Sequence, residues 1–452
     1  MELQYDFETL EAMVKNRQYR ELKEALMEMN EVDIAQFILD ITPTEYAILA
    51  FRTLPKELAA EVFSNLESDV QEAIINAITD RELAAIMEEL YVDDAVDMLE
   101  ELPANVVKRV LKNTQPDDRQ LINQFLKYPE NTAGSIMTAE FVDLKENMTV
   151  EDAIKRIRRT GEDKETIYTC YVLDSRRHLI GVVTVKGLLL AQDDDLVVDI
   201  MDDDVMKVMT TDDQEEVAYL FSKYDLLSIP VVDRENRLVG IITVDDAVDV
   251  MEEEVTEDFE KMAALIPSEK PYLRTGIFSL AKNRIPWLMI LMLSSTVTGA
   301  ILGEFEGAFA SWPILVTCIP MLTGTGGNAG GQTSTTIVRG MTIKEIELGD
   351  VLQVIWKEFR VALICGVALA AVNYVRVLLM YPGEPGIALQ SLVISLALLF
   401  TVVLANTIAG ILPLLAKRLN LDPALVAGPA LSTIVDIIAL LVYFMIVQML
   451  LV

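Results

Sequence analysis

The strongest constraint in this sequence is a series of five long apolar runs in its C-terminal part. Each run is long enough to cross the hydrocarbon core of a bilayer, which takes about 20 helical residues. Lipid offers the backbone no hydrogen-bond partners, so each run is expected to form a helix. The predicted spans cover roughly residues 285–302, 309–338, 359–380, 387–416 and 423–452.

The charged residues divide the chain into two portions. Of its 70 acidic and 37 basic residues, only 9 acidic and 10 basic ones lie from Arg274 onward, so the net charge of −33 belongs to the N-terminal portion. We expect an acidic soluble portion joined to a membrane portion surrounded by lipid. A large acidic field repels nucleic acid and attracts cations, although it also serves simple solubility. The N-terminus has no positively charged leader, so no cleavable signal peptide is expected.

Basic residues that flank the spans predict the orientation in the membrane. They lie before the first span, between the second and third, and after the fourth, whereas Glu304, Glu306 and Glu384 lie in the opposite loops. Arg376 is an exception. The pattern predicts a multi-pass protein with cytoplasmic N-terminal domains and a C-terminus outside. The basic residues are Arg274, Lys282, Arg284, Arg339, Lys344, Lys357, Arg360, Lys417 and Arg418.

A helical pattern repeats every twelve residues across residues 10–127. Dipeptides such as Leu54-Pro55 and Leu102-Pro103 occur at the same place in successive repeats. Each interval has room for about two turns of amphipathic helix. Short helices stacked in this way predict an all-α superhelical domain, whose simplest role is scaffolding.

The periodicity changes over residues 137–252. Two copies of a strand–turn–strand–helix unit occur there, in which Asp174 and Gly181 match Asp233 and Gly240. An amphipathic helix precedes each copy. Alternating β and α elements predict paired α/β modules, and the doubled pattern resembles two tandem CBS (cystathionine-β-synthase-type) domains.

These patterns predict a multi-domain protein in four parts. An acidic α-superhelical N-domain covers residues 1–130, and a tandem CBS pair covers 131–252, divided into about 131–193 and 194–252. A long connecting helix is expected over 253–274. An all-α transmembrane domain of five helices is expected over 275–452.

The second span contains an unusual glycine-rich stretch, "PMLTGTGGNAGGQTSTTIVRG", from Pro320 to Gly340. Such residues weaken a helix, and a broken backbone at membrane depth must line water or be buried in protein. We therefore expect exposed carbonyl and amide oxygens here, with Gly326, Gly327 and Asn328 lining an ion path. Close helix packing through small residues is the alternative.

The last span contains a carboxylate. Asp436 lies about two turns beyond Gly428-Pro429, which predicts a kink. A charge near the bilayer centre is costly and marks an ion or proton path by default. No basic residue within the spans is an obvious partner, so a mobile cation is the expected counter-charge. A structural aspartate is the alternative.

Together these features resemble the MgtE family of magnesium channels. The resemblance rests on the glycine-rich stretch, the "DP…GP…D" pattern of the last span, five spans, two CBS-like modules and the repeat-built acidic N-domain, in the family's order over essentially the whole chain. It implies a homodimer in the cytoplasmic membrane with Asp436 facing a pore on the two-fold axis, lined also by Gly428 and Pro429. Magnesium would pass there while still largely hydrated. Some relatives carry Asn where this chain has Gly428, so only backbone is offered here.

Carboxylates also cluster in three cytosolic places, and each cluster taken alone resembles a solvated charged face. The resemblance implies that regulatory magnesium ions bind where N-domain, CBS and connecting-helix acids face one another. Cations between like charges favour the compact arrangement, which would hold the connecting ("plug") helix closed. The candidate ligands are Asp93, Asp94, Asp97, Asp213, Glu215, Asp225, Asp246, Asp249, Glu254, Glu257, Asp258 and Asp422.

A nucleotide is a second candidate cofactor. CBS modules often bind ATP or another adenine nucleotide through a Thr and an Asp after the second strand. Thr243 and Asp246 fit this pattern, whereas the first copy has Thr184 without the acid. At most one nucleotide site per subunit is expected.

The leading functional prediction is a Mg²⁺-selective channel or transporter gated by intracellular Mg²⁺. Hard oxygen ligands discriminate weakly, so a broader divalent cation transporter (Mn²⁺, Co²⁺) is an alternative. A non-conducting CBS-type membrane sensor is another, although a pure sensor does not need Asp436. An enzyme is not expected, because we find no nucleophile–base set, no P-loop and only one histidine, His178.

Overall fold

Helices of the N-terminal part begin at regular intervals, as the sequence repeat predicts. The computed structural model of the chain describes residues 6–267, 272, 275–305 and 312–451. From α4 to α10 each helix begins twelve residues after the previous one. The helices are α1 (Phe7–Lys15), α2 (Tyr19–Leu26), α3 (Glu31–Asp40), α4 (Thr44–Phe51), α5 (Lys56–Ser64), α6 (Ser68–Ala77), α7 (Asp80–Met87), α8 (Val92–Glu101), α9 (Ala104–Asn113) and α10 (Pro116–Phe125).

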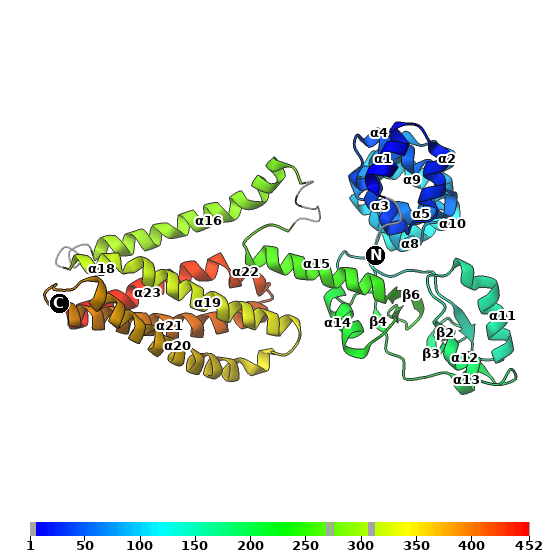
Figure 1. Cartoon of the computed structure of the whole chain (residues 1–452). Helices are drawn as coiled ribbons and strands as arrows, with labels where there is room; N and C mark the ends of the chain where they lie inside the picture. Colours follow the sequence, from blue (N-terminus) through cyan, green and yellow to red (C-terminus); the bar gives the residue numbers. More distant parts are fainter. Residues whose placement is uncertain (1–5, 268–271, 273–274, 306–311, 452) are drawn as a thin grey trace. The chain divides into compact units, whose positions relative to one another are not determined.

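The repeated dipeptides mark the helix starts. Pro43, Pro55 and Pro103 each occupy the N-cap position, and Thr79 forms a capping box with Glu82. Each short helix turns its apolar face inward, and Figure 1 shows the helices wound into a superhelix. The prediction of an all-α repeat domain is confirmed.

Two small three-stranded sheets follow, and they have the same topology. In each, the first strand is parallel to the second and the second is antiparallel to the third. The strands are β1 (Asp143–Lys145), β2 (Thr169–Leu173), β3 (Leu179–Thr184), β4 (Val208–Met209), β5 (Ser228–Val232) and β6 (Leu238–Thr243). The accompanying helices are α11 (Val150–Thr160), η1 (Gly161–Asp163), α12 (Val185–Leu190), α13 (Val197–Ile200) and α14 (Gln214–Tyr224).

Residues that match between the two copies have matching structural roles. Asp174 accepts two backbone N–H bonds in the turn between β2 and β3, and Asp233 does the same between β5 and β6. A Cβ on Gly181 would lie 2.5 Å from the sulfur of Met201, and a Cβ on Gly240 would lie 2.7 Å from the sulfur of Met137. Glycine is therefore needed at both places because a neighbouring segment crosses the strand there.

The connecting helix differs from its predicted limits. The chain divides into two compact units, residues up to Met251 and residues from Glu252 onward, and one helix, α15 (Val244–Met262), belongs to both. The helix expected over 253–274 thus begins inside the second CBS copy and ends at Met262. Residues 268–271, 273 and 274 of the predicted helix lie outside the described residues.

The second unit is built from long helices. These are α16 (Ile277–Glu304), α18 (Pro313–Thr317), α19 (Ile319–Thr342), η2 (Leu348–Asp350), α20 (Val351–Met380), α21 (Ile387–Arg418), α22 (Ala424–Ala427) and α23 (Pro429–Leu450). By length and composition, four described helices can cross a membrane: Ile277–Glu304, Leu348–Met380, Ile387–Arg418 and Ala424–Leu450. The second predicted span corresponds to α18 and α19, whose glycine and hydroxyl residues lower the hydropathy.

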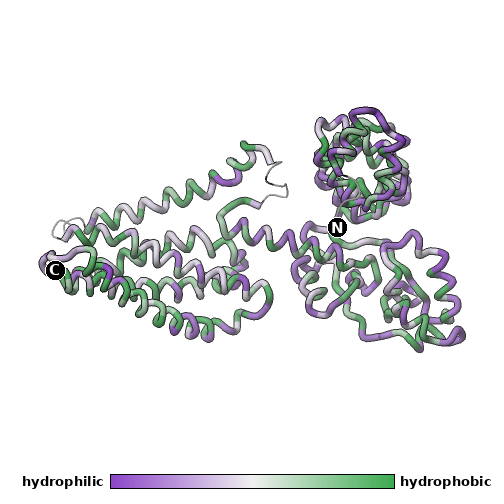
Figure 2. The backbone as a smooth tube through the Cα atoms, in the orientation of Figure 1, coloured by the Kyte–Doolittle hydropathy of each residue, from purple (hydrophilic) through white to green (hydrophobic). Residues whose placement is uncertain are grey.

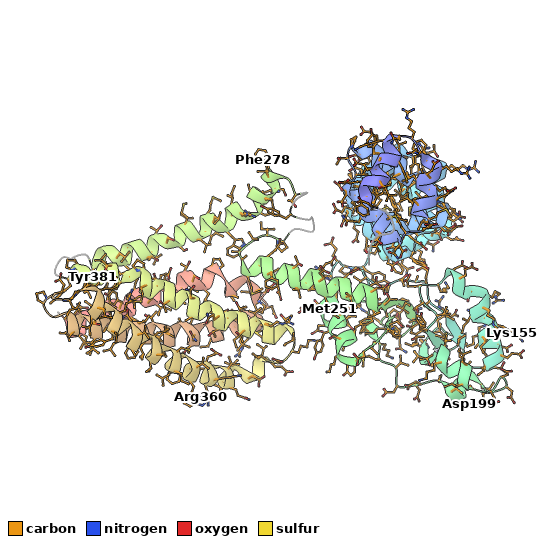
Figure 3. The ribbon with its side chains drawn as sticks, in the orientation of Figure 1. Lys155, Asp199, Met251, Phe278, Arg360 and Tyr381 are labelled. Atoms are coloured by element: carbon orange, nitrogen blue, oxygen red, sulfur yellow. The ribbon has the colours of Figure 1, made fainter. Side chains whose placement is uncertain are left out.

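Helix α21 lies at the centre of this unit. It packs against α20, α19 and α23, and half of the residues in its most apolar 18-residue segment are buried. Figure 2 shows the largely apolar course of these helices. By contrast, α16 has no buried residue along its length, and Phe278 at its start is 92% exposed (Figure 3). One whole helix of the unit is thus left with most of its apolar surface uncovered.

Candidate ion pathway and acidic clusters

The glycine-rich stretch is an unbroken helix. Helix α19 spans Ile319–Thr342 and contains the whole "GTGGNAGG" segment. The expected broken backbone with free carbonyls is therefore wrong, and the alternative of close packing through small residues holds. The physical reason is that the bundle packs closely against part of the stretch, at Gly326 and Gly330, which compensates for the weak helix propensity.

The glycines of α19 fall on two different faces. A Cβ on Gly326 would lie 2.7 Å from Thr401 of α21 and 3.0 Å from Val435 of α23, so this glycine permits a close three-helix contact. A Cβ on Gly327 would lie 3.7 Å from the hydroxyl oxygen of Ser432 in α23, which is ordinary van der Waals contact. Asn328, in contrast, is exposed. Of the three residues predicted to line the path, only Gly326 is buried in the packing.

Helices α22 and α23 meet at a sharp break in the chain. Gly428 has φ −104° and ψ −123°, and Pro429 begins α23. The predicted kink is therefore a helix interruption. The second turn after the break carries Asp436, which is partly exposed in the single chain. Within the described part of the chain, neither a hydrogen bond nor an ion pair reaches its carboxylate.

A group of carboxylates lies within the first unit. Burial, followed by the negative charge of Asp246, raises the pKa of Asp94 to about 6. Burial likewise raises the pKa of Asp246 to about 6. Burial, followed by the charge of Asp246, raises the pKa of Glu165 to about 7. The first turns of α8 and α15 therefore place acids from the N-domain and the second CBS copy within electrostatic reach of each other.

The neighbouring Asp93 has an unsatisfied oxygen. Its Oδ1 is buried without a hydrogen-bond partner among the described groups, and burial together with Asp94 and Asp246 raises its pKa well above the usual value. An orphaned carboxylate oxygen among other acids suits a hard cation such as Mg²⁺. However, no three acids, cysteines or histidines in the described ranges are close enough to form a ready ligand set. A bound ion would have to draw these acids together.

The other predicted cytosolic ligands of this unit are placed differently. Asp213 caps α14 by accepting from the backbone N–H groups of Glu215 and Glu216, which is a structural role. Asp225 ends the same helix in a left-handed conformation, with φ 52°. Asp97, Glu215, Asp225 and Asp249 are all exposed.

The C-terminal end of α15 carries the third acidic group. Lys261 bonds to Asp422 at 2.6 Å and to Glu257 at 2.7 Å. Asp258 accepts a hydrogen bond from the Thr342 hydroxyl at 3.2 Å. Glu254, one turn earlier, is half-buried. These four candidates thus lie on or against one helix end, together with a lysine that the sequence argument omitted.

The two candidate nucleotide residues contact each other. The Thr243 hydroxyl donates to Asp246 at 2.6 Å, and the Thr243 backbone N–H donates to the same oxygen. In the first copy, the Thr184 hydroxyl instead accepts from the Gly187 N–H at the start of α12. The structure thus preserves the asymmetry between the copies seen in the sequence.

Family models match the N-terminal domain, both CBS copies and most of the long-helix unit. Residues 5–131 match the MgtE intracellular N domain, 133–194 and 197–253 match the CBS domain, and 319–446 match the MgtE divalent cation transporter domain. The magnesium transporter MgtE of Thermus thermophilus is 37% identical over 447 residues, covering 98% of both chains. The MgtE of Bacillus subtilis is 30% identical, covering 96% of this chain and 94% of its own.

This chain belongs to the MgtE family. The two relatives named above are magnesium transporters, and the family model that matches residues 319–446 is described as a divalent cation transporter. The soluble part of a magnesium transporter matches with a TM-score of 0.51 and 32% identity, covering 55% of this chain and 97% of that one. The cytosolic domain of the Mg²⁺ channel MgtE in complex with ATP matches with a TM-score of 0.52 and 37% identity, covering 54% and 100%.

Several residues in these sites were missed by the sequence argument. The charges of Glu165, in the loop before β2, and Glu140, before β1, add to the raised pKa of Asp93, but both residues lie far along the chain from Asp93. Lys261 was not predicted, because only acidic residues were considered as candidate ligands. Glu358 lies inside α20, where its carboxylate accepts from the buried Thr333 hydroxyl at 2.9 Å. Glu358 was missed because the predicted third span begins one residue later, at 359, whereas α20 begins at Val351.

Proposed function

We propose that this MgtE-family chain forms a magnesium-selective channel as a homodimer in the cytoplasmic membrane, with its N-terminal domains in the cytoplasm and its C-terminus outside. Intracellular magnesium closes the channel. The observation that carries the proposal is Asp436, a carboxylate inside an apolar helix with no hydrogen bond or ion pair from the described residues. A charge inside an apolar span without a protein partner calls for a mobile counter-ion.

The surroundings of Asp436 support a pore for a hydrated ion. Gly428 interrupts the backbone two turns before it, and Asn328 of α19 is exposed rather than packed. Magnesium gives up its water reluctantly, so a single ring of oxygens around a hydrated ion suits it. In a two-fold dimer, a pair of Asp436 side chains supplies that ring, with Gly327 and Pro429 shaping the wall, while Gly326 holds α19 against α21 and α23.

Exposed apolar surface supports the homodimer. None of the residues of α16 is buried, and Phe278, Met292 and Leu293 are each more than half exposed. In a membrane, such a helix faces lipid or a second copy. Asp436 is half-exposed in the single chain, and an isolated carboxylate cannot face lipid. The five-helix unit is therefore expected to form half of a pore.

Regulation rests on the acidic group of Asp93, Asp94 and Asp246. Burial, and after it the charges of neighbouring acids, raises the pKa values of these three carboxyls, and the orphaned Asp93 oxygen suits a cation. Magnesium therefore favours the compact arrangement of the cytosolic domains. Compaction holds α15, whose other end carries Glu254, Glu257 and Asp258, in its closed position.

An adenine nucleotide is proposed as a modulator at the second CBS copy. The related cytosolic domain was determined in complex with ATP. Here Asp246 serves both the Thr243 pair and the acidic group, so a nucleotide and a regulatory ion would act on one carboxylate.

Flux into liposomes tests the conducting role. Purified full-length protein is reconstituted with a magnesium-sensitive dye inside, and Asp436→Asn is compared with the native chain. The matched control is Glu384→Gln, which removes an exposed carboxylate outside the helices. We expect native flux from the control and a loss of at least tenfold from Asp436→Asn, the rate change that corresponds to about 1.4 kcal/mol. Equal flux from all three would refute the pore role. No flux from any would favour a sensor, and Mn²⁺ or Co²⁺ flux equal to Mg²⁺ flux would refute selectivity.

A further inference from the structure

The C-terminal end of α15 is fixed in the second unit by several different contacts. The Met262 side chain packs against the buried cluster of Val338, Ala424 and Ala427. Its carbonyl oxygen lies directly over Gly428, where a Cβ would overlap with it. The helix end is therefore held by apolar packing and by a backbone approach that only glycine permits at position 428.

Polar contacts surround this packing. Lys261 is 19% exposed and bridges two acids, Asp422 at 2.6 Å and Glu257 at 2.7 Å. We call this contact the Lys261 bridge. Asp422 also caps α22 by accepting from the Ala424 N–H at 2.8 Å. The ammonium thus joins the end of α15 to a loop that leads directly into the helix interruption at Gly428.

The local charge balance leaves the bridge incomplete. Glu257, Asp258 and Asp422 contribute three negative charges, and Lys261 contributes one positive charge. Burial raises the pKa of Asp258, and the charge of Asp422 adds to this effect. Burial acts to lower the pKa of Lys261, but its hydrogen bonds to Asp422 and Glu257 outweigh it and the pKa is raised. Lys261 contacts two of these three carboxylates, and one ammonium neutralises only part of the group.

We propose that Lys261 is a positioning residue that holds the end of α15 on Asp422 without any dissolved cation. This inference rests on the proposed gating function. A side-chain ammonium cannot leave the group, so the closed arrangement keeps one attraction when magnesium is absent. Dissolved cations then need to neutralise only the remaining charge. Lys261 thereby sets the magnesium concentration at which the channel closes.

Loss of the Lys261 ammonium should change the magnesium dependence of closure in one direction. Without the ammonium, three carboxylates repel one another in the closed arrangement, and dissolved magnesium must supply the whole attraction. The closed population at zero magnesium then falls, and the magnesium concentration for half-closure rises. A coupling of typical size corresponds to a shift of about fivefold or more.

Three variants of the full-length protein in liposomes test this. Lys261→Gln removes the charge, and Lys261→Arg keeps it. Lys417→Gln removes an exposed lysine at the end of α21, for which the described residues provide no ion pair. Two readouts are followed across a magnesium titration on the cytoplasmic side: magnesium flux, and hydrogen exchange of the backbone amides of residues 255–262.

We expect Lys261→Gln to lose amide protection at zero magnesium and to need about fivefold more magnesium for half-closure. Lys261→Arg and Lys417→Gln should match the native chain. A Lys261→Gln midpoint equal to the native one, or an equal shift in Lys417→Gln, would overturn the proposal. Hydrogen exchange does not depend on conduction, so a chain that conducts nothing would refute the proposed function and still test the bridge.

Discussion

Val435 of α23 packs against the bare Cα of Gly326 in α19, so that a Cβ on that glycine would lie 3.0 Å from a Val435 methyl carbon. Asp436, the proposed ion-path residue, is the next residue along α23. The glycine stretch therefore determines how closely the two helices carrying the candidate path approach each other. At Gly326 the stretch brings three helices into close contact, and the proposed ion path would depend on that approach.

This relationship predicts opposite effects for two glycine substitutions in one helix. Gly326→Ala places a methyl group 2.7 Å from Thr401 and 3.0 Å from Val435, so we expect a loss of about 1–3 kcal/mol by overpacking. Gly331→Ala meets no atom within 4 Å. We expect it to gain up to about 1 kcal/mol, because alanine is the better helix former. Thermal unfolding of the two variants in the same detergent measures the difference, and equal midpoints would contradict it.

The sequence predicts repeated elements better than their ends. The twelve-residue period set the starts of α4 to α10, because proline or a polar cap interrupts the helix at each repeat. The doubled strand pattern likewise predicted two sheets of the same topology. The connecting helix was placed too late because no cap residue marks a boundary at 253. The chain passes from the Thr243–Asp246 pair into α15 without interruption.

The sequence indicated candidate site residues, but it did not predict the contacts that they make. Asp436 and Gly428 were identified from sequence because charges and breaks are conspicuous in an apolar run. The continuity of α19 was not, since glycine's low propensity is overridden by packing against helices distant in the chain. Lys261 and Glu165 depend on neighbours at long sequence separation, and no local pattern reports those neighbours.

The pKa values of the first unit predict a pH dependence. Asp94 and Asp246 have folded pKa values of about 6, and Glu165 of about 7, all above the usual unfolded values near 4. The folded state therefore binds more protons, and stability falls as pH rises. Without divalent cations, the contribution of these three carboxyls to the stability of the cytosolic unit should be greatest below about pH 4. It should lose that contribution progressively up to about pH 7.

Unfolding of the full-length protein in detergent, followed by the hydrogen exchange of α8, measures this dependence. Titrations at pH 5 and pH 7.5 are compared with and without millimolar magnesium. We expect magnesium to protect α8 more at pH 7.5, where the carboxylates are charged. Protection that rises with pH in the absence of magnesium would contradict the assignment of these pKa shifts.

Removing one charge from this group should mimic the cation. Asp93→Asn eliminates a buried charge whose Oδ1 has no partner, so we expect the magnesium-free compact form to gain about 1–3 kcal/mol. Protease resistance at zero magnesium should rise, and the further effect of magnesium should shrink. Asp117→Asn, an exposed acid on α10, serves as the control and should leave both unchanged. A variant that still requires the native magnesium concentration would exclude Asp93 from the regulatory group.

Glu358 provides a test of polar packing within the bundle. Its carboxylate accepts from the Thr333 hydroxyl, which is 5% exposed, and its side-chain carbons pack over Gly410 of α21. Glu358→Ala leaves the hydroxyl without its acceptor and opens space beside the glycine, so we expect a loss of about 1–3 kcal/mol. Glu358→Gln keeps both the acceptor oxygen and the carbon chain and should remain within about 0.5 kcal/mol of the native chain. Unfolding in detergent distinguishes the two, and an equal loss from both would show that the negative charge itself, rather than the hydrogen bond and the packing, stabilises the bundle.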